Sequence, residues 1–65
     1  DNYFISYNPQ TDTIIAEVYY FVLSETSVEQ QLNQAKQDVV NTLNNIGVDT
    51  QKQKIQYLEI ASEPK

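Results

Sequence analysis

The most numerous side chains of this sequence that could do chemistry are carboxylates. Nine Asp and Glu residues stand against four lysines, and the chain has no His, Cys, Met or Trp. Without Cys and His there is no thiol nucleophile, no imidazole base, no ordinary zinc site and no disulfide. The scattered acids match no calcium loop, which needs alternating oxygen ligands and a glycine in about twelve residues. We therefore expect no metal site and no cofactor.

Two of the acids form the one candidate pair for catalysis. Glu17 and Glu59 fall in segments that we expect to be neighbouring strands, where their carboxylates could meet. Such a pair can do acid–base work when burial or mutual repulsion raises the proton affinity of one member. A chain this short can barely form the pocket that catalysis needs, and its one glycine cannot supply a phosphate-binding loop. We expect that the protein is not an enzyme.

The charge pattern argues against two classes of partner. The formal charge is −5, and the only basic grouping is Lys52 with Lys54, whereas nucleic-acid surfaces need clustered Lys or Arg. The longest apolar run, 18–23, has six residues, far short of the roughly 20 that a membrane-spanning helix needs. We expect no nucleic-acid partner and no membrane partner, and the composition indicates no compartment.

The length of 65 residues predicts one small domain over residues 1–65. Apolar residues make up 40% of the chain and include five Tyr and two Phe, a composition typical of a globular protein rather than of a disordered acidic tail. Domains of this size are marginally stable unless disulfides, metals or oligomerisation support them. Since disulfides are impossible here and a metal is not expected, a partner chain is favoured.

Alternation and turn residues predict a β-hairpin at the start of the chain. The segments 3–7 and 12–23 are rich in aromatic and β-branched residues, which favour strands. Asn8 and Pro9 begin a turn over 8–11. A four-residue loop there would place Ile5 opposite Ile14.

A helix and a third strand follow. Thr26 with Glu29 forms a possible capping box, and Ser27 with Gln30 is a competing cap one residue later. An apolar stripe with spacings of three and four then runs from Val28 to Ile46, and Gly47 suits a left-handed helix end. Residues 54–61 predict another strand. We expect an α+β fold in ββαβ order, a three-stranded, mostly antiparallel sheet with one helix packed on one face.

The second strand carries large apolar side chains on both of its faces, although the one helix can cover only one face. The other face carries Ile15, Tyr19, Phe21 and Leu23 beside Glu17, and an exposed apolar cluster usually marks an interface. We expect these four residues to form an interface, with a second copy of the chain or another protein as the partner. Sheet twist or a wrapped C-terminal tail could instead hide them. The part of the strand that extends past its hairpin mate could pair with the third strand or with a second copy.

Two other surfaces remain open to interpretation. The polar face of the helix is rich in Gln and Asn, which could recognise a partner, although exposed helix faces are usually solvent faces. The acidic balance allows an alternative function, a small acidic inhibitor or decoy that binds a basic surface of a partner. That function needs acids grouped on one face, and here they are dispersed. The main hypothesis is a non-catalytic protein–protein interaction module that forms a homodimer through the outer sheet face or the edge of the second strand.

Overall fold

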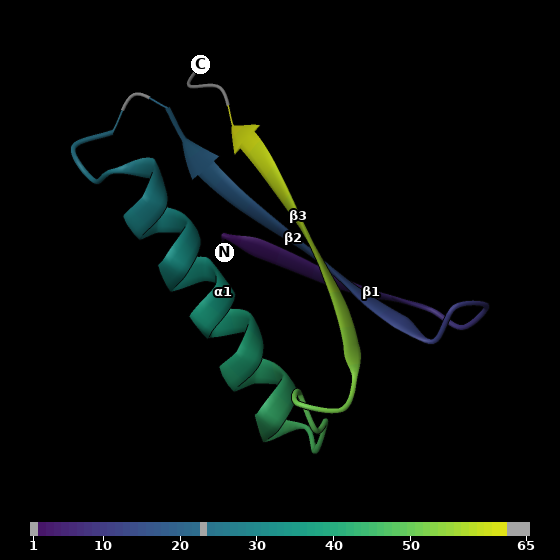
Figure 1. Cartoon of the computed structure of the whole chain (residues 1–65). Coiled ribbons are helices and arrows are strands. Elements are labelled where there is room, and N and C mark those ends of the chain that lie inside the picture. Colours follow the sequence, from purple (N-terminus) through teal and green to yellow (C-terminus); the bar gives the residue numbers. More distant parts are fainter. Residues whose placement is uncertain (1, 23, 63–65) are drawn as a thin grey trace.

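The computed structural model describes residues 2–22 and 24–62. The elements follow in the order β1 (Tyr3–Asn8), β2 (Thr13–Phe21), α1 (Val28–Asn45) and β3 (Lys54–Ser62). Figure 1 shows α1 lying along one side of the sheet, with the β1–β2 hairpin extending away from the helix. The predicted α+β fold in ββαβ order is confirmed.

The sheet has the strand order β1-β2-β3, so β2 is its central strand. β1 pairs with β2 in the antiparallel sense, whereas β3 pairs with β2 in the parallel sense. The parallel pairing follows from the connection between these two strands. After β2 the chain runs back along the sheet through α1, so β3 starts at the same end of the sheet as β2. The sheet is therefore mixed, and the expectation of a mostly antiparallel sheet needs this correction.

The hairpin register differs from the predicted one by two residues. Ile5 lies opposite Ala16, and the last pair before the turn joins Asn8 and Thr13. The loop therefore covers 9–12 rather than 8–11, and Asp12 adopts a left-handed conformation with φ 49°, which Asp tolerates better than most residues. Because the shift is an even number of residues, every side chain keeps its predicted face.

Both ends of α1 are fixed by local hydrogen bonds. Ser27 is the N-cap, and its hydroxyl accepts a hydrogen bond from the backbone N–H of Gln30, so the later of the two predicted caps is the one formed. At the other end Gly47 has φ 91°. The backbone N–H of Val48 donates to the carbonyl of Leu43 at 2.9 Å, which closes the helix in a Schellman motif.

The buried core is small and contains no aromatic residue. Its apolar members come only from β2 and α1: Ile14, Ala16, Val18, Ala35, Val39 and Leu43. Tyr3, Ile5 and Tyr57 are partly buried and pack against its margin. The chain therefore buries its small aliphatic side chains and leaves its largest ones at or near the surface.

Candidate functional site

One face of the sheet is covered by no other element among residues 2–22 and 24–62. The core uses the even-numbered residues of β2, so α1 lies against that face, and the odd-numbered residues point to the other side. We call this other side the outer face. Its large apolar side chains come from all three strands: Phe4, Ile15, Tyr19, Phe21, Leu58 and Ile60.

These six residues, which we call the outer-face cluster, lie around Glu17 and extend along β2 to its last residue, Phe21. Phe4 and Leu58 flank Glu17 from the two outer strands, and Ile60 lies beside Tyr19. Phe4 is 56% exposed, Phe21 50% and Leu58 39%. Contiguous exposed apolar side chains of this size mark an interaction surface in most soluble proteins.

The structure places three of the four predicted interface residues on this surface. Ile15 and Tyr19 are half-buried between the flanking strands, and Phe21 is exposed. Leu23, the fourth predicted residue, lies outside the described residues. The expected apolar excess on this side of the second strand is therefore present over 15–21.

Sequence reasoning missed the members of the cluster that lie on the outer strands. Phe4 alternates with Tyr3 and Ile5, so its position on the opposite face could have been read from the period of two. Leu58 and Ile60 needed the pairing of β3 with β2, which depends on the strand order. That order was not evident from the pattern of residues.

The electrostatics of the outer face centre on Glu17. The hydroxyl of Tyr19 donates a hydrogen bond to Glu17 Oε1 at 3.1 Å. Partial desolvation, followed by this hydrogen bond and the carboxylate charge, raises the pKa of Tyr19 above its usual value. The surface therefore combines apolar side chains with a single hydrogen-bonded carboxylate.

The predicted carboxylate pair does not form. Glu17 lies beside Leu58, whereas Glu59 lies beside Val18, one residue further along both strands. Neighbouring positions on a strand point to opposite faces, so the two carboxylates are on opposite sides of the sheet. Glu59 instead accepts a hydrogen bond from Lys36 Nζ at 2.9 Å on the helix side, and the same ammonium lies 5.5 Å from the centre of the Tyr57 ring.

Neither backbone edge of β2 is free, so the expectation that two copies could associate through the edge of this strand needs correction. β3 pairs with β2 along its whole length, from Thr13 to Phe21. β1 covers the other edge up to Tyr19, whose N–H donates to the carbonyl of Asn2. The third strand thus supplies the partners within the chain, and the face of β2 remains the exposed feature.

A glutamine side chain covers the last part of that edge. Gln31 Oε1 accepts from the backbone N–H of Phe21 at 2.9 Å, and Gln31 Nε2 donates to the Phe21 carbonyl at 3.0 Å and to the Thr26 carbonyl at 2.9 Å. The carboxamide therefore bonds to Phe21 in the way that a residue of a neighbouring strand would. Gln31 belongs to the face of the helix that is rich in Gln and Asn, and no pattern in the sequence points to this role.

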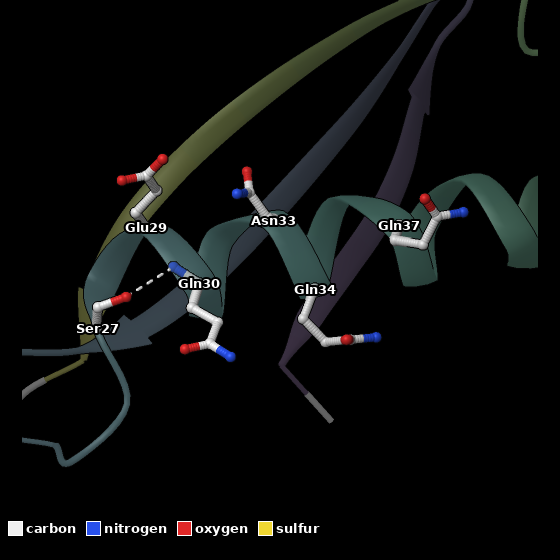
Figure 2. A pocket seen from close by; sticks show the side chains of 6 residues that line it. All are labelled: Ser27, Glu29, Gln30, Asn33, Gln34 and Gln37. Carbon is white, nitrogen blue, oxygen red and sulfur yellow. Dashed lines mark hydrogen bonds between the residues drawn. The ribbon is translucent and has the colours of Figure 1, made fainter.

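The amide-rich face of α1 forms a shallow polar hollow of about 390 Å³. Figure 2 shows its side chains spread along the helix, with Ser27 and Gln30 joined by the capping hydrogen bond. Nearby amides bond to residues one turn further on, since Gln34 donates to Asp38 and Gln37 donates to Asn41. These contacts are typical of a solvated helix surface.

A second hollow, of about 430 Å³, lies between the hairpin and the C-terminal end of α1. Its walls are mostly apolar and include Leu43 and Ile46. At its rim the Tyr7 hydroxyl donates to Asp12 Oδ1 at 2.6 Å. This hydrogen bond, together with desolvation and the nearby charge, raises the pKa of Tyr7 above its usual value.

Neither hollow brings together the groups of a reactive site. Within the described part of the chain, no three acidic side chains gather as metal ligands. The helix at 28–45 is not apolar enough to cross a membrane. Comparison with known protein families, with curated proteins and with solved structures gives no match, so the candidate site rests on its own geometry.

Proposed function

We propose that this chain is a small protein–protein interaction module that forms a homodimer through its outer face. The observation that carries the proposal is the outer-face cluster, which lies opposite the helix and is covered by no described element. That the protein is not an enzyme, and that it needs no cofactor, remain predictions from composition.

The distribution of aromatic residues supports an interface. All seven lie outside the fully buried core, although aromatic side chains supply most of the apolar area that proteins can bury. Phe4 and Phe21 together expose more apolar surface than any pair of core residues. Aromatic residues in the centre of a patch are also the residues that contribute most to binding free energy.

The available area fits a weak dimer. Three strands spaced by about 4.8 Å and nine residues of about 3.3 Å each define a face of roughly 400 Å² before side-chain relief is counted. Two such faces approach the roughly 1,000 Å² at which specific interfaces begin. The accessible surface of 4876 Å² also exceeds the roughly 4,200 Å² expected for a chain of 7.5 kDa. We expect a dissociation constant in the micromolar range.

Sedimentation equilibrium over a dilution series tests the proposal, together with amide and methyl NMR spectra at the same concentrations. We expect a reversible monomer–dimer equilibrium in which the signals of Phe4, Phe21 and Leu58 shift with concentration. Ile46, which is 71% exposed on the helix side, is the internal control and should not shift. A folded monomer at every concentration would overturn the proposal.

Salt dependence separates this function from the acidic-decoy alternative. Association of two copies that each carry a charge of −5 should stay the same or strengthen as salt rises, whereas binding of a basic surface by carboxylates weakens steeply. The described carboxylates lie on different elements, and one of them, Glu59, is already paired with Lys36. No geometric observation favours the decoy function.

A further inference from the structure

The outer face has a carboxylate at its geometric centre. β2 is the middle strand, and Glu17 is the fifth of its nine residues. Phe4 and Leu58 flank it across the sheet, and Ile15 and Tyr19 flank it along the strand. A charged group is thus surrounded on four sides by large, mainly apolar side chains.

Few charged or titratable groups face Glu17. On β2 its neighbour is Tyr19, whose hydroxyl donates to it. On β1 the nearest outer-face residues are Phe4 and Ser6, neither of which carries a charge. On β3 the described part of the outer face has one cation, Lys54, which lies beside Thr13, four residues from Glu17 along the strand.

The helix brings no charged group to Glu17, because the α1 residues that reach the end of β2 near Tyr19 and Phe21 are the uncharged Gln30, Gln31 and Gln34. α1 packs on the opposite face, and the one ion pair among residues 2–22 and 24–62 joins Lys36 and Glu59 there. Glu17 therefore has a hydrogen-bond donor but no cation at ion-pair distance within the described chain.

Two-fold symmetry determines which residue of the second copy lies opposite Glu17 in a dimer. When two identical faces stack with maximal overlap, the two-fold axis lies between the sheets and passes over their centres, whichever way the strands cross. The centre of each face then lies opposite the centre of the other, so Glu17 faces Glu17. Packed sheets are about 10 Å apart, which brings two Glu side chains that extend towards each other close together in a largely apolar layer.

We propose that proton uptake by the facing Glu17 carboxylates controls this self-association; the inference rests on the proposed homodimer. Two carboxylates in one apolar site cannot both stay ionised without a large cost, and sharing one proton removes most of the repulsion. One proton is then taken from solvent for each dimer formed. Linkage makes the dimer about tenfold tighter for each pH unit of acidification in the range where this proton is taken up.

Sedimentation equilibrium tests the inference when it is run on the wild type and on Glu17→Gln at several pH values between about 7.5 and 5. Only pH values at which far-UV circular dichroism shows native structure are compared. Glu17→Gln keeps the size and the hydrogen-bonding capacity of the side chain and removes its charge. We expect its dimer to be at least about tenfold tighter than the wild-type dimer at neutral pH and to show little pH dependence.

Glu29→Gln is the matched control, because it removes the same charge from an exposed position in the first turn of α1. Its dissociation constant and pH slope should stay close to those of the wild type. A slope that is lost in Glu17→Gln and kept in Glu29→Gln supports the inference, as does a Glu17→Gln dimer where the wild type is monomeric.

Two other outcomes overturn different proposals. If the wild type and Glu17→Gln form dimers with the same affinity and the same slope, the role of Glu17 is wrong while the homodimer stands. If neither protein associates at any pH at which it is folded, the homodimer itself is wrong.

Discussion

Replacing Phe21 with lysine is the most direct test of the interface, because the size of the effect follows from the exposed fraction of the side chain. Phe21 is 50% exposed in the single chain, and a whole phenylalanine buries roughly 200 Å². Complete coverage would remove about 100 Å² per copy, worth about 2.5 kcal/mol at 25 cal/mol per Å². A two-fold dimer loses this contribution twice, so Phe21→Lys should cost about 5 kcal/mol and weaken association by roughly a thousandfold or more.

The stability of the single chain should change much less. Phe21 is the last residue of β2 and takes no part in the buried core. We expect the free energy of unfolding to fall by about 1 kcal/mol at most, as is usual for a half-exposed position. Lysine is the better replacement because an aspartate could find Lys54 of a second copy across the interface.

Sedimentation equilibrium and urea unfolding of the same sample separate the two effects. Ile46→Lys is the control, since Ile46 is 71% exposed at the C-cap of α1 and is not a member of the outer-face cluster, and its dimer should match the wild type. The reasoning is refuted if Phe21→Lys is folded and keeps the wild-type dissociation constant.

Three further predictions concern the parts of the fold that support this face. Gln31→Leu removes three hydrogen bonds and should cost about 1–2 kcal/mol; hydrogen exchange at the Phe21 amide should accelerate, and unchanged exchange would contradict the assigned role. Leu43→Ala empties a site that is 2% exposed and should cost about 2–5 kcal/mol in urea unfolding, so a smaller loss would show that the core relaxes around it. Tyr7 is held in its neutral form by Asp12; its contribution to stability is therefore complete below the normal tyrosine pKa and is lost as pH rises through the raised one. Subtracting the ultraviolet titration of Tyr7→Phe from that of the wild type isolates the ionisation of Tyr7, whose pKa should lie above that of free tyrosine. In an Asp12→Asn background the pKa of Tyr7 should move closer to the value of free tyrosine.

In the β1–β2 hairpin the alternation of residues predicted which face each side chain occupies, but not how far the two strands are shifted along each other. Alternation with a period of two is preserved when a hairpin shifts by two residues, so Ile5 faces the core whether it lies opposite Ile14 or Ala16. The choice between those registers depends on the turn, where Asp12 adopts a left-handed conformation. One Asp in a polar loop gives no clear signal of that conformation.

The helix was predictable because several local signals agree. Ser27 caps its start, an apolar stripe follows, and Gly47 ends it. The parallel position of β3 and the contact between Gln31 and Phe21 depend instead on tertiary placement. For that reason Leu58 and Ile60 on β3 could not be placed on the outer face from the sequence, whereas its β2 residues could, and Phe4 could have been placed there from its period of two.

A core without aromatic rings changes which spectroscopic signals report on which event. Near-ultraviolet circular dichroism arises from aromatic side chains held in fixed, asymmetric surroundings, yet the buried residues here are aliphatic apart from Thr13. The near-ultraviolet spectrum of the isolated chain should therefore come mainly from the partly buried rings at the core margin, such as Tyr3 and Tyr57. A near-ultraviolet signal that grows with protein concentration would show that Phe4, Tyr19 and Phe21 become immobilised against a second copy. Far-ultraviolet circular dichroism would then follow folding, and near-ultraviolet circular dichroism would follow assembly.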